Sequence, residues 1–142
     1  MKRKITTFVL LLFVSLSLSA QSSTTLQKLI NKNWMYIQKY TNSYEACQLK
    51  EVFTTTTLDV IAICRGEATA SDPYSFYLSD QIETFFNHSK VGNVQNGKYI
   101  ISYMPDYKGI TLFEVDEIIT ITDTYLEIKS LRSGQTFRFN VQ

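Results

Sequence analysis

Apolar and polar residues alternate through most of the chain after residue 33. In the last such segment Phe137, Phe139 and Val141 share one face, and polar residues share the other. A period of two is typical of β-strands that bury one face. Runs rich in aromatic and β-branched residues, separated by turn residues, predict eight or nine strands. These runs are residues 34–40, 47–53, 58–64, 74–78, 81–86, 98–104, 110–118, 125–131 and 135–141.

A short helix is predicted ahead of the first strand. Residues 24–31 place Leu26, Leu29 and Ile30 on one side, behind a capping Ser23 or Thr24. No amphipathic helix of about ten residues or more lies between the later strands, which excludes βαβ winding. A sandwich or a closed barrel remains. Short connections favour an up-and-down antiparallel β-barrel of about eight strands, because closure removes the exposed sheet edge.

Residues 1–20 form a separate unit. Basic residues at 2–4 precede an apolar run that ends at Leu18, and small residues lead to Ala20. This is the pattern of a secretory signal peptide. A retained membrane anchor is the alternative, although the apolar run is shorter than the ~20 residues that a spanning helix needs. We therefore expect one exported domain, residues 21–142, in the periplasm or outside the cell, with no stable membrane anchor after cleavage.

The charge of the chain argues against a nucleic-acid partner. Loss of the signal peptide removes three of the 14 Lys and Arg residues, which leaves 14 − 3 = 11 against 13 Asp and Glu. The remaining lysines are scattered singly along the sequence. They form no basic stripe of the kind that follows a phosphate backbone.

The two cysteines, Cys47 and Cys64, are expected to form a disulfide in an oxidising compartment. Two free thiols are the alternative. If Thr55 and Thr56 form a two-residue turn, residues whose numbers sum to 111 face each other, and the cysteines are such a pair. The threonines lack the Gly or Asn that tight turns favour, so a wider corner is also open. The spacing fits no zinc pattern.

The single tryptophan, Trp34, opens the first predicted strand. An exported chain with a short helix, a lone Trp at the head of the first strand and about eight meandering strands resembles the bacterial lipocalin-like proteins. Residues 113–139 are similar to the last hairpins of that family, and the resemblance covers roughly residues 26–141. The chain departs from the family at Lys32, where a glycine is usual.

The lipocalin-like resemblance implies structural roles for two residues. Trp34 is expected to pack across the closed end of the barrel, and Arg138 is expected to stack on its ring as a cation on a π face. The alternative is that Trp34 is an ordinary buried aromatic residue and Arg138 a solvated strand residue.

The nine tyrosines, together with several phenylalanines, suggest an amphipathic pocket or an exposed contact patch. The alternative is that they fill and rim a small barrel. If they line a cavity, alternation should send one face of residues 98–104 inward together with aromatic residues of the later strands. The expected ligand-binding side chains, which should together border one void of at least about 300 Å³, are Tyr99, Ile101, Tyr103, Phe113, Val115, Phe137 and Phe139.

Catalytic motifs are absent from the sequence. His88, the single histidine, has no acidic neighbour in sequence and is expected on a surface loop. Glu114, Asp116 and Glu117 form an acidic cluster, which we interpret as a solvated strand edge rather than a calcium site or a carboxylate pair. We therefore expect no catalytic residues, cofactor or metal, and no enzyme activity.

Two functions remain open. The barrel binds a small apolar or amphipathic ligand in its interior, or it has a filled core and acts as an extracytoplasmic protein-interaction module of the inhibitor or immunity type. The number of strands does not decide between them, because an eight-stranded barrel is wide enough for a packed core or for one small ligand.

Overall fold

The computed structural model describes residues 22–37, 40–41, 46–107 and 110–142. The predicted signal peptide, residues 1–20, lies outside the described residues. Within the described part, no helix has the length and apolar character needed to cross a membrane. The elements in chain order are α1 (Thr25–Leu29), β1 (Asn33–Tyr36), β2 (Tyr40–Thr41), β3 (Ala46–Phe53), β4 (Thr57–Cys64), β5 (Glu67–Ala70), β6 (Tyr74–Ser79), the 3-10 helix η1 (His88–Lys90), β7 (Tyr99–Tyr107), β8 (Ile110–Ile121), β9 (Tyr125–Ser130) and β10 (Thr136–Val141).

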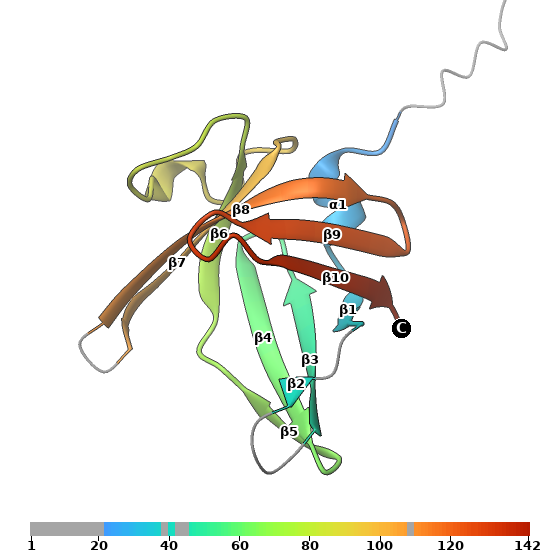
Figure 1. Cartoon of the computed structure of the whole chain (residues 1–142). Helices are drawn as coiled ribbons and strands as arrows, with labels where there is room; N and C mark the ends of the chain where they lie inside the picture. Colours follow the sequence, from blue (N-terminus) through green and yellow to red (C-terminus); the bar gives the residue numbers. More distant parts are fainter. Residues whose placement is uncertain (1–21, 38–39, 42–45, 108–109) are drawn as a thin grey trace, which may run out of the picture.

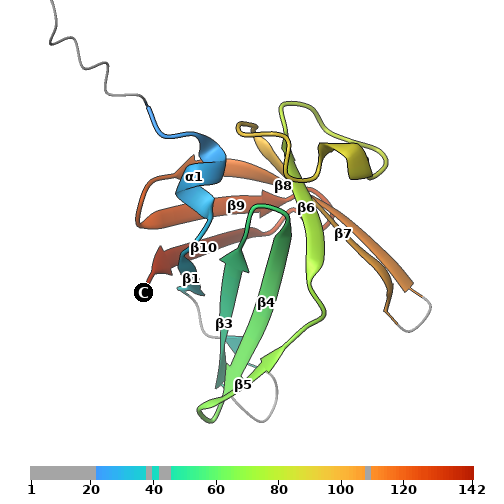
Figure 2. The same cartoon turned by 180° about the vertical axis from the view of Figure 1, so that it is seen from behind.

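Antiparallel pairing closes the described strands into an eight-stranded barrel (Figures 1 and 2). From β6 to β10 each strand pairs with the next along the chain, and β4 pairs with both β3 and β6. β1 pairs with β3 on one side and with β10 on the other, which completes the circle. The short strands β2 and β5 extend the pairing of β3 and β4. The predicted up-and-down barrel with a short N-terminal helix is confirmed.

Residues 81–86 do not form the predicted strand. They belong to the long connection between β6 and β7, residues 80–98, which contains η1 (Figure 1). Phe86 and Val91 of this connection pack on residues of the outer face of β6, β7 and β8. β6 and β7 therefore carry large apolar residues on both faces, because the connection covers one face and the barrel interior takes the other.

The hairpin of β3 and β4 has the predicted register. Every opposed pair sums to 111, from Cys47 and Cys64 at one end to Phe53 and Leu58 at the other. A disulfide joins Cys47 to Cys64, with the two Cα atoms 4.4 Å apart. The predicted disulfide is confirmed, and it ties together the ends of the two strands that lie farthest from the turn.

The turn of this hairpin has two residues, although it contains neither Gly nor Asn. The backbone N–H of Thr54 donates to the carbonyl of Thr57 at 2.8 Å. The hydroxyl of Thr54 accepts the N–H groups of Thr56 at 3.1 Å and Thr57 at 2.9 Å. A threonine hydroxyl therefore fixes the turn through hydrogen bonds to backbone N–H groups. Ser and Thr are favoured in turns because their hydroxyls can bond nearby backbone groups in this way.

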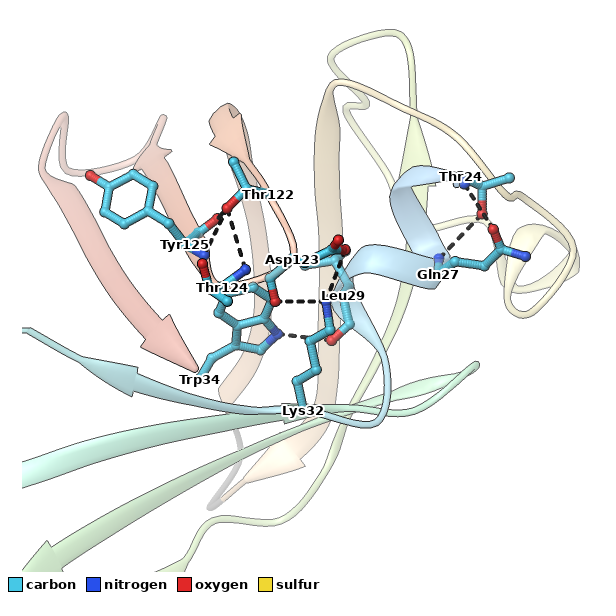
Figure 3. A network of polar contacts seen from close by, with 9 residues as sticks. All are labelled: Thr24, Gln27, Leu29, Lys32, Trp34, Thr122, Asp123, Thr124 and Tyr125. Atoms are coloured by element: carbon cyan, nitrogen blue, oxygen red, sulfur yellow. Dashed lines mark hydrogen bonds and ion pairs between the residues drawn. The ribbon is translucent and has the colours of Figure 1, made fainter. Parts of the chain in front are cut away.

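Helix α1 and Trp34 fill one end of the barrel, which we call the closed end (Figure 3). Thr24 and Gln27 form a capping box at the start of the helix. Leu26 and Leu29, the buried side of the helix, pack in the same cluster as Trp34. Trp34 is 0% exposed, and its indole Nε1 donates to the carbonyl of Leu29 at 2.8 Å. The helix therefore satisfies the one polar group of the buried indole.

Lys32, rather than Arg138, is the cation that lies over Trp34. Its Nζ is 5.5 Å from the centroid of the indole ring, and it donates to the carbonyl oxygen of Asp123 at 2.9 Å (Figure 3). Arg138 instead pairs with Glu127 at 3.3 Å. The predicted stacking of Arg138 is wrong because Trp34 points into the barrel, whereas Arg138 alternates with two inward-facing phenylalanines and points out.

Removal of the disulfide should lower the free energy of unfolding by roughly 3 kcal/mol, because the bridge limits the entropy of the unfolded chain. The Cys47→Ala/Cys64→Ala variant and the oxidised wild type are compared by urea denaturation. Thiol titration of the unfolded, unreduced wild type provides the check on the bridge itself. Two reactive thiols per chain would contradict the disulfide.

Replacement of Trp34 by Ala should cost about 3–5 kcal/mol of unfolding free energy, as deletions of large core side chains do. Lys32→Met keeps the aliphatic stem but removes the charge and the hydrogen bond to the carbonyl of Asp123, so it should cost about 1 kcal/mol. Both values come from chemical denaturation. A Trp34→Ala variant with the wild-type Tm would rule out the closed-end role of this residue.

Candidate functional site

A cavity of about 250 Å³ lies inside the barrel, toward the turn between β9 and β10. We call that end of the barrel the open end. Strands β1, β3, β8, β9 and β10 supply the wall, and the turn supplies two residues at the mouth. The cavity is lined by Tyr36, Leu49, Glu51, Glu114, Asp116, Ile128, Ser130, Arg132, Ser133, Phe137 and Phe139.

One wall of this cavity is aromatic. The ring of Tyr36 on β1 lies 5.9 Å from that of Phe137 and 5.5 Å from that of Phe139, measured between centroids. The register of β1 and β10 explains the contact, because Tyr36 is directly opposite Phe139 and cross-strand partners share a face. Leu49 and Ile128 extend the apolar surface.

The other wall carries three carboxyl groups, those of Glu51, Glu114 and Asp116. Glu51 is directly opposite Trp34 in the pairing of β3 with β1, so it points to the same side as the buried indole. Asp116 is opposite the buried Ile100, and Glu114 is opposite a buried serine of β7. A second cavity of about 170 Å³ is lined by the same three carboxyl groups. The acidic residues therefore lie between two neighbouring spaces of the interior.

The carboxyl group of Glu51 is enclosed by the barrel. Its Oε2 exposes less than 1 Å² and has no hydrogen-bond partner within the described part of the chain. Burial raises the pKa of Glu51 from 4.5 to about 8, and the negative charge of Asp116 adds to the rise. A buried acceptor without a donor is costly, so this atom is a place where a ligand gains a favourable contact.

The neighbours of Glu51 indicate a negative interior. Burial, followed by the charge of Glu114, raises the pKa of Asp116 from 3.8 to about 6. Burial raises the pKa of Tyr74 as well, with the charges of Glu114 and Glu51 adding to it. Among the described residues, Arg132 is the one cation lining the larger cavity, and its Nη1 lies 3.1 Å from Oε1 of Glu114.

The structure separates the seven side chains that were expected to line a pocket. Of the seven, Phe137 and Phe139 line the larger cavity, and its volume of about 250 Å³ is below the predicted void of at least about 300 Å³. The other five lie on the outer face of the barrel, under the connection of residues 80–98, where Phe86 stacks on one of them with centroids 4.9 Å apart. These five are Tyr99, Ile101, Tyr103, Phe113 and Val115.

The prediction that all seven share one face is wrong, for a steric reason. Residues 99–104 are apolar in both phases of the alternation, so periodicity alone does not define the inner side. The interior of an eight-stranded barrel holds little more than its own side chains. The inner face of β7 takes Ile100, Ser102 and Met104, and the larger tyrosines lie outside.

The three interior carboxyl groups are the residues that sequence reasoning missed or misplaced. The prediction of a solvated strand edge is wrong for Asp116, which lies opposite the buried Ile100 inside the barrel. Glu114 lines the cavity at its mouth, where its side chain is 33% exposed. Glu117, the third member of that cluster, alternates with Asp116 and belongs to the outer face. Glu51 gave a signal of its own, since it lies in phase with Leu49 and Phe53 on the apolar face of its strand.

Other candidate chemistry lies away from the cavity. His88 is exposed on the connection of residues 80–98, and its ring stands edge-on to Phe86 at 4.9 Å between centroids. Among the residues that the structure describes, no group of three or more His, Cys, Asp and Glu side chains is placed to hold a metal ion.

Comparison of the chain with protein-family models, with curated proteins and with solved structures gives no match. The lipocalin-like family therefore remains a proposal based on the sequence pattern. The structure itself defines the class of molecule, which is a closed eight-stranded antiparallel β-barrel with an acidic and aromatic cavity in its interior.

The stability of the folded protein should depend on pH through Glu51. Its pKa is higher in the folded than in the unfolded chain, so the folded state holds more protons between about pH 4.5 and pH 8 and loses stability as pH rises through that window. The shift corresponds to no more than about 5 kcal/mol. Glu51→Gln should remove this dependence and be more stable than wild type at about pH 8.

The matched control for this measurement is Glu117→Gln, which changes an outward carboxyl group on β8. Urea denaturation at several pH values is expected to show the wild-type dependence in this variant. Equal slopes of stability against pH in Glu51→Gln and the wild type would contradict the enclosed position of Glu51.

Proposed function

We propose that the protein is an exported, lipocalin-like β-barrel that binds a small amphipathic ligand in the cavity at its open end. The observation that carries the proposal is the pairing, in one space of about 250 Å³, of an aromatic wall with the unpartnered Oε2 of Glu51. Small-molecule sites typically combine apolar surface with a few polar groups that fix the orientation of the ligand.

Export is supported by two independent features. The first 20 residues have the three-part pattern of a signal peptide. The Cys47–Cys64 disulfide is of the kind that persists in oxidising compartments. We propose binding rather than catalysis, because the sequence contains no Gly-x-Ser-x-Gly motif that would present a serine nucleophile.

A protein-interaction function is the second candidate, and one observation favours it. Ile82 and Phe85, on the connection of residues 80–98, are 59% and 67% exposed. Exposed apolar side chains on a connecting segment are suited to contact with another protein. Native mass spectrometry of the protein purified from its own source separates the two functions, since a bound small molecule and a bound polypeptide add different masses.

Filling the cavity should abolish small-molecule binding. Leu49→Trp places a large side chain in the cavity, whereas Lys50→Trp places the same side chain on the opposite face of β3. Titration of the full, disulfide-bonded chain with 2-phenylethylamine, 2-phenylethanol and 3-phenylpropionate by calorimetry is expected to show binding of at least one compound to wild type and Lys50→Trp. Leu49→Trp should bind none, at a cost of about 1–3 kcal/mol in stability from overpacking.

Two results would count against a binding function. One is failure of all three compounds to bind the wild type. The other is equal binding by Leu49→Trp and Lys50→Trp, which would locate the contact outside the cavity.

A further inference from the structure

We propose that the ligand of the cavity is a primary amine, with its ammonium group held by Glu51 and Asp116 and its apolar part against Tyr36, Phe137 and Phe139. This inference rests on the proposed function and adds the chemical class of the ligand. Four observations carry it: the balance of charge in the cavity, the missing donor at Glu51, the enclosure of the carboxyl groups and the aromatic wall.

The charge lining the cavity is unbalanced. Of the residues that the structure describes, three carboxyl groups and one guanidinium group line it. The guanidinium group of Arg132 is committed to Glu114 at the mouth, where its side chain is 65% exposed. Within the described part of the chain, Glu51 and Asp116 are left with no cation within ion-pair distance. A ligand that brings one positive charge compensates for this excess.

The missing donor at Glu51 restricts the kind of cation. Oε2 of Glu51 accepts no hydrogen bond from any described residue. A primary ammonium group has three N–H donors, as the side chain of lysine has, and can reach more than one carboxyl group. A quaternary ammonium group has none and would leave Oε2 unsatisfied. Charge-assisted bonds of this type are the stronger class of hydrogen bond.

The enclosure of the carboxyl groups makes a cation more favourable here than on a surface. Burial and the charge of Asp116 both disfavour the carboxylate form of Glu51. An opposite charge within about 4–6 Å reverses that effect and favours the ionised form. A neutral alcohol offers a hydrogen bond but no such compensation, so the interior should discriminate by charge between molecules of the same shape.

The aromatic wall defines the rest of the ligand. The ring of Tyr36 packs against those of Phe137 and Phe139 at centroid distances of 5.9 Å and 5.5 Å, and all three residues line the cavity. Such surface suits an aliphatic or aromatic group and also attracts a cation. The space of about 250 Å³ is below the roughly 300–1,000 Å³ of pockets for drug-sized ligands, so the amine must be small.

The test is a calorimetric titration of the full, disulfide-bonded chain at about pH 8, where a primary alkylamine is still protonated. 2-Phenylethylamine is expected to bind at least about tenfold more tightly than 2-phenylethanol, which has a similar shape without the charge, and 3-phenylpropionate is expected to bind most weakly. The trimethylammonium analogue of the amine, which lacks N–H donors, is expected to bind more weakly than the amine.

Variants locate the charge effect. Glu51→Gln should reduce the affinity for the amine about tenfold or more and leave the affinity for the alcohol unchanged. Asp116→Asn should also reduce the affinity for the amine. Two independent variants keep the test valid if one of them fails to fold. Glu117→Gln, with its change on the outer face of β8, should bind both compounds as wild type does.

A pH comparison adds a second readout. At about pH 5, below the pKa values of about 8 for Glu51 and about 6 for Asp116, both groups are protonated and the amine should lose its advantage over the alcohol. Among the residues that the structure describes, the charged and titratable groups lining the two cavities with Glu51 are Asp116, Glu114, Tyr74 and Tyr36, with Arg132 at the mouth.

The outcomes separate the two proposals. If the alcohol binds as tightly as the amine, and Glu51→Gln changes neither, the amine specificity is wrong while the binding function stands. If calcium or magnesium ions compete with the amine and bind more tightly, the acidic residues hold a metal ion, and the proposal that the ligand is an amine is wrong. If none of the compounds binds, both proposals fail together.

Discussion

The register of β3 between its two neighbours is the constraint on which the rest of the molecule depends. Glu51 lies opposite Trp34 on β1 and opposite Val60 on β4. Cross-strand partners share a face, so the pairing that buries the indole at the closed end also turns the carboxyl group into the interior. A slip of one residue would replace Glu51 by Lys50 inside the barrel and would separate the cysteines.

Two devices at opposite ends of the β3–β4 hairpin hold this register. At one end the hydroxyl of Thr54 fixes a two-residue turn, and at the other the disulfide joins Cys47 to Cys64. The enclosed carboxyl group of Glu51, whose Oε2 has no hydrogen-bond donor among the described residues, destabilises the folded state at neutral pH. The turn and the disulfide together offset this cost. Locally unfavourable groups that the surrounding structure keeps in place are characteristic of functional sites.

The distribution of aromatic residues explains why the interior has space at all. The connection of residues 80–98 covers β6, β7 and β8 from outside, so Tyr99, Tyr103 and Phe113 find their contacts on the outer face. Inside, β7 presents Ile100, Ser102 and Met104, whereas β6 contributes Phe76 and Leu78 to the core. A barrel of this width with those rings turned inward would be filled, because protein interiors pack at the density of organic crystals. The position of the connection therefore decides whether a cavity exists.

Local signals in the sequence determined the helix cap, the barrel class and the β3–β4 register, because each depends on residues that are near one another in the chain. Thr24 and Gln27 form the capping box, and the cysteine spacing fits the two-residue turn. Phe137 and Phe139 were placed in the cavity because their strand has one polar face. Only the tertiary structure decided the rest. Strands with two apolar faces carry no periodic signal for inside and outside, and the placement of Glu51, Glu114 and Asp116 depends on which face the distant connection covers and on how β1 closes the circle.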